Sequence, residues 1–506
     1  MVSASRSITA RLGVKTTWSI SNYFHTQVFR SHRSDKLSFP LPLRERVTER
    51  RRSRARSGEG LSSSKYYSSE PLSRIALAIA PRDPPSPARG EGKEFAARPY
   101  HLTLIPSALR RLAGLCLLTL VYGSLAHAQD SEPPRQRVTI GYVEIEGDVR
   151  YEPIKAYERL ILKAREHPFA GAQIGLDDAK VLSRVLKTDF ALERITVKSA
   201  AEVAPAVQQA MASRDMRFFI VDAPAEAFAP LAAAVRERDV LLFNATAPDD
   251  ALRRDLCANE VVHVFPSLSM SMDGLVQYLV SRKWRDFLVL QGAQSGDVMA
   301  AKAFEASAKK FGARVVANKP FKVGTDPRER EQNNPALLSA INRDYDVVFV
   351  ADDAFDFARQ VPYHLVKPRP VVGSIDLEPM AWHWTWEHNG APQVNTRFQK
   401  LTGRRMEGAD WAAWIAVKMV VQAVLRTKSS DFKTQRDFIL GGAAFDGDKG
   451  LAMSVRPWDH QLRQAILLAT PYYVAASAPV DGFFHQTNVL DTLGDDEPQS
   501  PCHLNK

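Results

Sequence analysis

Short, largely apolar segments that alternate with helical patterns constrain the fold of this chain more than any other feature. The first such segment is Val138–Ile145, and similar runs recur at Phe218–Val221 and Val240–Phe243. Strands that are apolar on both sides are typical of a parallel sheet covered by helices on both faces. The expected elements between them are helices at 177–186, 203–211 and 228–238 and a strand at 194–197. The sequence therefore predicts a doubly wound α/β unit.

A second series of the same kind begins after Phe265-Pro266-Ser267. One apolar helical face is formed by Met272, Leu275, Val276, Leu279 and Val280, which follow helical spacing. The expected strands are 287–290, 314–317, 347–350 and 370–372, and the expected helices are 299–311 and 336–342. A last helix, 410–427, has only a narrow polar stripe, so we expect it to be largely buried. One or two more strands are expected between 470 and 489.

The predicted fold class is α/β, with two doubly wound parallel-sheet lobes joined by a hinge. Lobe 1 is expected to comprise residues 138–265 and about 388–455, and lobe 2 residues 266–387 and about 456–490. Residues 491–506 are expected to be a C-terminal tail.

Residues 110–128 have the features of a secretory signal peptide. Arg110 and Arg111 precede an apolar run that is too short to span a bilayer and ends in Ala126-His127-Ala128. We expect cleavage after Ala128 and a periplasmic location. Residues 1–109 are then a disordered or misassigned N-terminal extension, because a chain so rich in Arg, Ser, Pro and Gly cannot form a core. An internal segment that mimics a signal, and a basic arm for nucleic acid, remain the alternatives.

The high isoelectric point is no evidence for nucleic acid as a partner, and we expect none. Residues 1–128 carry 21 basic and 8 acidic side chains, whereas residues 129–506 carry 46 and 49. The high isoelectric point therefore belongs to the leader. Of the cysteines outside it, Cys257 and Cys502 could form a disulfide or remain as two thiols. No later stretch is as long and apolar as a transmembrane helix, so we expect a soluble mature protein.

Candidate ligand-binding residues follow from a rule for open parallel sheets, whose ligands bind beyond the carboxyl ends of the strands. The rule selects polar residues and exposed backbone at the predicted strand ends, where hydrogen bonds could anchor a polar solute. They are Glu144, Asp148, Asp222, Asn244, Ala245, Thr246, Ser295, Asp352, Asp353, Ser374 and Asp376. Any one of them could instead be a turn or helix-capping residue.

The segment 382–388 contains three tryptophans at alternating positions. Trp382, Trp384 and Trp386 could line a binding cleft and stack on a planar ligand or a cation, or they could belong to the core. His383 and His388 are a poor metal pair, so we expect no metal. The chain has no nucleophile elbow, phosphate loop or dinucleotide fingerprint, which favours a protein that is not an enzyme and has no cofactor.

These residues resemble the type I periplasmic binding proteins of the Leu/Ile/Val-binding kind, over about 138–489. The resemblance rests on Ile140-Gly141-Tyr142, Phe243-Asn244-Ala245-Thr246, Phe265-Pro266-Ser267 and the helix from Trp411 to Leu425. More specifically, the chain is similar to ABC-transporter substrate-binding proteins associated with pyrroloquinoline-quinone-dependent alcohol dehydrogenase systems. That similarity rests on the runs His167–Ala172, Ala381–Trp384, Gly390–Gln393 and Asp410–Trp414.

The resemblance implies a periplasmic solute-binding protein whose two lobes close on a small polar solute and then dock on an ABC permease in the inner membrane. Ala245 and Thr246 would hold the polar head of the ligand, and Asp352 or Asp353 would approach from lobe 2. Ser295-Gly296 stands where amino-acid binders have Tyr-Gly, which argues against an amino-acid ligand. The alternative functions are an accessory protein that binds a periplasmic quinoprotein dehydrogenase without transporting a solute, and a periplasmic enzyme. A repressor of this fold would need a helix-turn-helix, which the sequence lacks.

Overall fold

The structure is a computed structural model that describes residues 135–155, 161–322, 324 and 326–504. The predicted N-terminal extension and signal peptide lie outside the described residues.

Lobe 1 is built on a five-stranded sheet in which every neighbouring pair of strands is parallel. Its strand order is β4-β1-β5-β6-β7. The strands are β1 (Gln136–Ile145), β4 (Thr188–Val197), β5 (Phe218–Asp222), β6 (Leu241–Asn244) and β7 (Val261–His263). This order is doubly wound, so the chain moves outward from β1 in both directions, as the sequence predicts.

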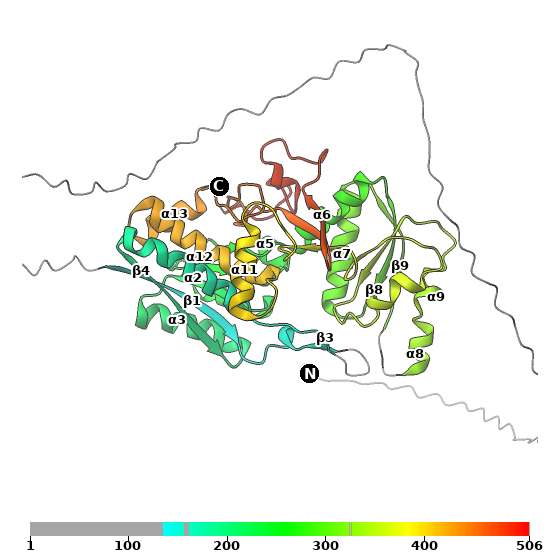
Figure 1. Ribbon diagram of the computed structural model, residues 1–506, viewed down its shortest axis with the longest axis horizontal. Helices are drawn as coiled ribbons and strands as arrows, with labels where there is room; N and C mark the ends of the chain where they lie inside the picture. Colours follow the sequence, from blue (N-terminus) through cyan, green and yellow to red (C-terminus); the bar gives the residue numbers. More distant parts are fainter. Residues whose placement is uncertain (1–134, 156–160, 323, 325, 505–506) are drawn as a thin grey trace, which may run out of the picture. The chain divides into compact units, whose positions relative to one another are not determined.

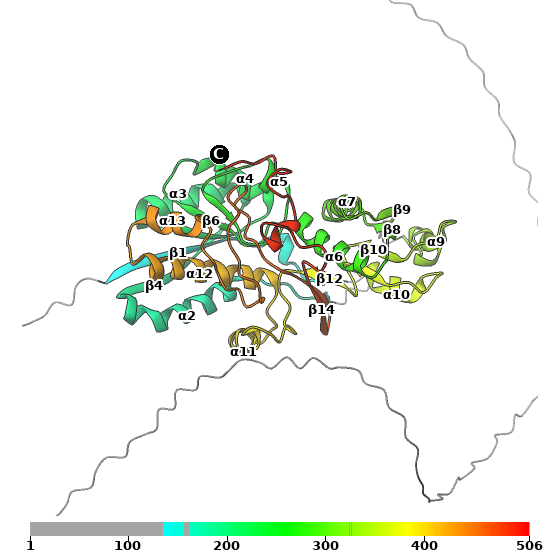
Figure 2. The ribbon, with the colours of Figure 1, turned by 90° about the horizontal axis from the view of Figure 1, so that it is seen from above.

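Helices cover both faces of the lobe 1 sheet. They are α2 (Phe169–Leu186), α3 (Val203–Arg214), α4 (Ala225–Ala234) and α12 (Gly408–Thr427). Along β5, Phe218 and Ile220 join the core with α2 and α12, whereas Phe219 and Val221 join the core with α3 and α4. Figure 2 shows α2 and α3 on opposite sides of β1 and β4. The alternation explains why these strands are apolar on both sides.

Helix α12 is the centre of the lobe 1 core. Among the described residues it is long and apolar enough to cross a membrane, which corrects the expectation that no later stretch would be, but 72% of that stretch is buried inside the protein. The predicted polar stripe consists of Lys418 and Gln422, which are partly exposed, and Arg426, which is exposed. Helix α2 packs closely on α12, since a side chain at Gly171 would collide with the backbone carbonyl of Asp410. Helix α2 begins at Phe169, well before the start at residue 177 that the sequence predicted.

Lobe 2 contains a four-stranded parallel sheet of order β11-β10-β8-β9. Its strands are β8 (Asp286–Gln291), β9 (Arg314–Pro320), β10 (Val347–Ala351) and β11 (Val371–Gly373). One face packs on α6 (Leu268–Ser281) and α7 (Ser295–Lys310), and the other packs on the shorter α9 (Pro335–Ser339) and α10 (Val361–His364). Helix α8 (Pro327–Gln332) has no buried residue. The predicted fold class, two doubly wound α/β lobes, is confirmed.

Three crossovers join the two lobes in the described residues. The first is the loop from Val264 to Leu268, the second is β12 (Glu378–Met380), and the third runs from Leu462 into β13 (Ile466–Thr470). Strands β12, β13 and β14 (Tyr473–Ala478) form an antiparallel sheet. Gln464 Nε2 donates to the backbone oxygen of Val264 at 2.7 Å. The crossovers are therefore hydrogen-bonded to one another.

The core contacts move the lobe boundaries slightly from the predicted ranges. Trp382 already packs in the lobe 1 core, and so does Leu462. The remaining lobe 1 helices are α11 (Ala391–Thr402) and α13 (Phe432–Leu440), and short elements occur at α5 (Ala251–Arg254) and in the hairpin of β2 (Ile154–Lys155) and β3 (Ile161–Lys163). Figure 1 shows this hairpin beyond the tip of β1.

The C-terminal segment is packed into the structure and is not the free tail that the sequence suggested. Leu490, Leu493 and Cys502 are buried. Cys257 and Cys502 form a disulfide, which decides the alternative that the sequence left open. This bond joins the end of the chain to the region between α5 and β7 in lobe 1.

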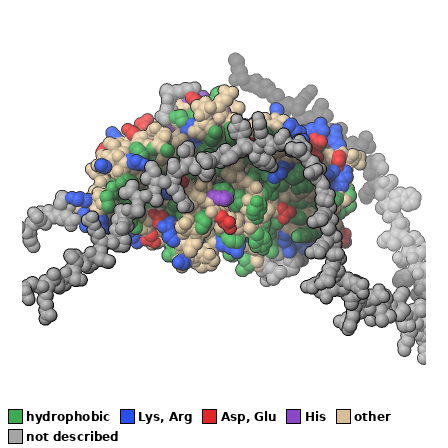
Figure 3. Space-filling model, turned by 45° about the horizontal axis from the view of Figure 1, so that its top comes forward, with side chains coloured by type: hydrophobic (Ala, Val, Ile, Leu, Met, Phe, Trp, Pro, Cys, Tyr) green, Lys and Arg blue, Asp and Glu red, His purple; other side chains and the backbone are tan. Residues whose placement is uncertain are grey.

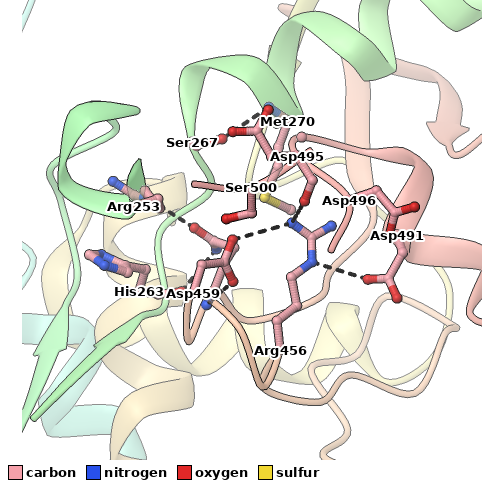
Figure 4. Close-up of polar contacts among 12 residues, drawn as sticks. Arg253, His263, Ser267, Met270, Arg456, Asp459, Asp491, Asp495, Asp496 and Ser500 are labelled. Carbon is pink, nitrogen blue, oxygen red and sulfur yellow. Dashed lines mark hydrogen bonds and ion pairs between the residues drawn. The ribbon is translucent and has the colours of Figure 1, made fainter. Parts of the chain in front are cut away.

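Buried ion pairs hold the C-terminal segment beside the third crossover. Figure 4 shows the Arg456 side chain lying between Asp459 and Asp491. Its Nε donates to Asp491 Oδ1 at 3.1 Å and its Nη2 to the backbone oxygen of Leu493 at 2.6 Å. Arg463 also binds Asp491, with Nε at 2.7 Å from Oδ1. Because these charges are shielded from water and paired, the segment is part of the folded unit.

The surface of the described residues carries both signs of charge. Figure 3 shows Lys and Arg interspersed with Asp and Glu on the visible face. This mixture agrees with the near balance of charge over residues 129–506.

Candidate functional site

Asp222 is the centre of a polar cluster at the carboxyl edge of the lobe 1 sheet. Its carboxylate is fully buried at the end of β5 and accepts hydrogen bonds from Tyr142 at 3.1 Å and Tyr151 at 2.6 Å. The Arg150 guanidinium donates to it at 3.1 Å, and His167 Nδ1 lies 2.7 Å from it. The five side chains come from β1, β5 and the segment that follows β1.

Arg150 connects this cluster to the predicted ligand loop. Its Nη1 donates to Thr246 Oγ1 at 3.0 Å, and its Nε and Nη2 bind Asp148 at 2.9 and 2.6 Å. Asp148 also caps the short 3₁₀ helix of residues 149–151 by accepting from the Arg150 backbone N–H. Arg150 thus forms hydrogen bonds with three of the residues that the sequence analysis selected, Asp148, Asp222 and Thr246.

The charges at this edge are mutually compensated. Glu144, buried at the end of β1, is bound by Arg194 at 2.7 and 3.0 Å and by Thr196 at 3.0 Å. Burial by itself would raise the pKa of Asp222, but the hydrogen bonds from His167 and Tyr151 and the charge of Arg150 outweigh it and lower the pKa. Asp222 is therefore ionised at neutral pH.

Asn244 and Ala245 shape the ligand loop from inside. The Asn244 side chain accepts from the Ala247 N–H at 3.0 Å and donates to the Ala247 oxygen at 2.9 Å. Ala245 is fully buried, and its backbone N–H donates a hydrogen bond to the Val221 backbone oxygen. Of the three predicted residues of this loop, only Thr246 directs a side-chain oxygen to the cluster, because Asn244 and Ala245 are used in holding the turn.

In lobe 2, as in lobe 1, some of the predicted residues are bonded within the edge of the sheet and others remain accessible. Asp352 is buried and accepts from the backbone N–H groups of Phe357 and Ala358, while its own N–H donates to Ser374 Oγ at 2.9 Å. Burial raises the pKa of Asp352 to about 6. Ser295 and Asp353 are exposed. Asp352 and Ser374 therefore stabilise the edge, and Ser295 and Asp353 are left accessible.

Several site residues were not selected from the sequence. Arg150, Tyr151 and His167 complete the lobe 1 cluster, and Asp297 accepts from the Gln294 and Asp353 N–H groups at the start of α7. The signal for Asp297 was its position three residues after Gln294, the spacing of a capping box. Arg150 and Tyr151 carried no such signal.

The tryptophan segment is divided between the core and the wall of a cavity. Trp382 is buried, its ring is stacked 6.3 Å from that of Trp411, and its Nε1 donates to Asn395 at 2.9 Å. This placement in the core disagrees with the predicted ligand contact. Trp384 and Trp386 line a cavity of about 520 Å³ instead.

Two groups in the described residues have the side chains and spacing to hold a metal ion. They are Glu144 with His167 and Asp222, and His485 with Asp491 and Asp496. In the first group Arg150 and Arg194 already neutralise the carboxylates, and in the second Asp491 is paired with two arginines. Nearby guanidinium groups repel a cation, so neither arrangement favours a metal.

Glu378 on crossover β12 is a further titratable group in the hinge. Its pKa is raised to about 7, mainly by burial. The charge of Lys163 lowers the pKa, and the charges of Asp376 and Glu407 raise it further. Burial likewise raises the pKa of the predicted site residue Asp376. Both carboxyl groups therefore hold their protons more tightly in the folded protein than in the unfolded chain.

The Glu378→Gln variant should show a weaker decline of stability with pH. Because the folded pKa is the higher one, the contribution of Glu378 is complete below the ordinary value of 4.5 and is lost as the pH rises through about 7. Denaturant unfolding at pH 5, 6, 7 and 8 measures this decline. Between pH 5 and pH 8 the decline should be at least ~1 kcal/mol smaller in the variant. Glu331→Gln, at an exposed position, is the matched control and should follow the wild-type curve.

The arrangement of the two lobes is typical of one class of protein. Two doubly wound lobes joined by three crossovers are the architecture of type I periplasmic binding proteins. Residues 172–362 match the family model described as "Periplasmic binding protein". A comparison with curated proteins gave no match.

Solved structures of similar fold cover most of the described residues. A branched-chain amino acid ABC transporter periplasmic ligand-binding protein from Burkholderia xenovorans has 14% identity and a TM-score of 0.58, and the match covers 73% of this chain and 100% of that one. An amino acid ABC transporter substrate-binding protein from Pseudomonas fluorescens has 12% identity and a TM-score of 0.53, with coverages of 73% and 99%. A leucine-, isoleucine-, valine-, threonine- and alanine-binding protein from Brucella ovis in a closed conformation has 14% identity and a TM-score of 0.53, with coverages of 66% and 89%. These matches and the family model support the resemblance to periplasmic binding proteins in general, and they do not bear on the finer subfamily.

Proposed function

We propose that this chain is the periplasmic solute-binding component of an ABC importer and that it captures a small polar solute between its two lobes. The observation that carries the proposal is the cluster at the carboxyl edge of lobe 1. There Arg150 and His167, whose side chains are 27% and 21% exposed, meet Thr246 around a buried carboxylate. In lobe 2 the exposed Ser295 and Asp353 lie at the corresponding strand ends.

The binding step requires no bond chemistry. A solute that binds the closed arrangement of the lobes better than the open one shifts the population toward closure. The three crossovers are the segments where the backbone would rotate, and β12 and β13 keep their pairing while the lobes move as units. The closed form would then be the one that an inner-membrane permease accepts.

Native mass spectrometry of protein recovered from the periplasm tests the proposal. The expected result is a chain that begins at Gln129 and carries a bound solute. The Thr246→Val variant should retain less of that solute, since it loses a hydroxyl oxygen but keeps its shape. Thr427→Val is the matched control, because its hydroxyl bonds backbone groups at the end of α12, donating to the Ala423 oxygen and accepting from the Ser429 N–H. A chain that still contains residues 1–109, or one that never carries a solute, would contradict the proposal.

The finer association with pyrroloquinoline-quinone-dependent alcohol oxidation rests on the sequence runs quoted above and forms part of the proposal. The solute is then an acid derived from an alcohol, a quinone cofactor or its precursor. A processed chain without solute that binds a purified quinoprotein dehydrogenase would favour the accessory role instead.

A further inference from the structure

The cavity beside the tryptophan segment is lined on one side by aromatic side chains. It is bounded by residues 384–388, by α11 and by the turn between β13 and β14, and Trp384, Trp386 and Tyr473 are among its lining residues. Its volume of about 520 Å³ lies in the range of small-molecule sites. It is separate from the polar cluster at the edge of the lobe 1 sheet, because no residue of that cluster lines it.

Hydrogen bonds fix the wall in place. Asn395 of α11 accepts from the buried Trp382 indole at 2.9 Å and donates to the Trp384 backbone oxygen at 3.0 Å. The Trp386 indole donates to the Asp448 backbone oxygen at 2.9 Å. Because the Trp384 backbone and the Trp386 indole are each held by a hydrogen bond, the segment presents its rings without a large loss of conformational entropy on binding.

A guanidinium group without a carboxylate partner lies on this wall. The Arg405 Cζ is 3.4 Å from the centre of the Trp384 ring, and within the described part of the chain Arg405 has neither an ion pair nor a side-chain hydrogen bond. The neighbouring Arg404, in contrast, is bound by Asp410 at 2.7 Å and by Glu166 at 2.9 Å. The two adjacent arginines therefore have different roles, and Arg405 has free donors at the cavity.

Arg405 and Glu387 both line the cavity, and of the two it is Arg405 that lies on the Trp384 ring. A cation would have to share the Trp384 face with a guanidinium group that already occupies it, and the two charges would repel each other. A carboxylate can instead accept two parallel hydrogen bonds from the same guanidinium. Trp386, whose ring also meets His388 edge to face at 4.9 Å, and the exposed Tyr473 both line the cavity. Their remaining ring surfaces can stack on a planar group attached to that carboxylate.

We propose that this cavity is a second ligand site, which binds a planar aromatic carboxylate. The carboxylate pairs with Arg405, and the ring lies against Trp386 and Tyr473. This site is independent of the solute that the lobes capture. Tyr472 and Tyr473 are 78% and 64% exposed at its rim, so the site can fill without movement of the lobes.

Quenching of tryptophan fluorescence in the purified mature chain tests the proposal with a matched set of probes. They are 2-naphthoate, the uncharged 2-naphthamide, the cation 2-naphthylmethylammonium and the non-planar anion cyclohexanecarboxylate. We expect saturable binding of 2-naphthoate, and the other three probes should bind at least about tenfold more weakly. Arg405→Gln should weaken naphthoate binding to a similar extent, and added salt should weaken it in the wild type.

Two variants separate this site from other effects. Arg426→Gln, at an exposed arginine on α12, is the control for lost charge and should leave naphthoate binding unchanged. Thr246→Val should also leave it unchanged, although it lowers retention of the captured solute. Absence of saturable naphthoate binding, tighter binding of the ammonium probe, or equal binding by Arg405→Gln would each overturn the second site. Loss of naphthoate binding in Thr246→Val would do the same, because it would place the probe at the lobe 1 edge. The proposed solute receptor is tested separately, by mass spectrometry.

Discussion

Replacing Asp222 with alanine is expected to lower the free energy of unfolding by about 3–5 kcal/mol. The carboxylate is fully buried and forms contacts with four side chains, those of Tyr142, Arg150, Tyr151 and His167. Its removal leaves donors in the interior without an acceptor and frees the Arg150 charge from one of its two carboxylates. Chemical denaturation at pH 7 measures the loss.

Asp437→Ala is the matched control, since Asp437 is 66% exposed and its side chain pairs only with the adjacent Arg436. We expect a change below about 0.5 kcal/mol there. The effect at Asp222 should also depend on pH. Because its folded pKa is lowered, its contribution is present above the ordinary value of 3.8 and is lost as the pH falls through the folded value. Equal losses for the two variants at pH 7 would contradict the assigned role of Asp222.

The cluster around Asp222 also shows how far the sequence alone could lead. The rule for parallel sheets located Glu144, Asp148, Asp222 and Thr246 at one edge, because strand ends follow from the apolar pattern. It could not select Arg150, since the contact of Arg150 with Thr246 joins residues 96 positions apart in the chain. That contact depends on the path of the segment after β1, which has no periodic pattern.

The fold was more predictable than the limits of its elements. The apolar strands identified both parallel sheets, but the start of α2 was placed at residue 177 and lies at Phe169. Gly171 and Gly175 in that first half weaken a helical pattern. The structure explains them, because a side chain at Gly175 would come within 2.8 Å of Val417 on α12. Close helix packing, which local sequence does not encode, favours glycine at these positions.

The C-terminal segment shows the same limit. Its composition predicts a tail, yet Asp491 binds two arginines and Leu493 is buried. Those partners, Arg456 and Arg463, lie just before and within the third crossover, so only the folded chain reveals the role of the segment. The fate of Cys502 was undecided for the same reason, since pairing with Cys257 depends on distance in space.

Replacing both Cys257 and Cys502 with serine is expected to lower the free energy of unfolding by about 3–5 kcal/mol. The disulfide joins residues 245 positions apart, so in the unfolded chain it closes a very long loop. Loop-closure entropy grows with loop length, and the unfolded state loses more freedom through this bond than through a short one. Thermal and denaturant unfolding of the oxidised wild type and the double variant measure the difference.

The reduced wild type provides the matched control for side-chain effects of the substitutions. Reductant should lower the wild-type midpoint to that of the double variant and leave the variant itself unchanged. Alkylation of the folded protein should label neither cysteine before reduction. Since Arg254 binds Asp495 at 2.6 and 2.8 Å and Arg456 binds Asp491, the C-terminal segment keeps other anchors, and the double variant should still fold. A wild-type midpoint that does not respond to reductant would show that the bond contributes nothing to stability, and the entropy argument would then be wrong for this chain.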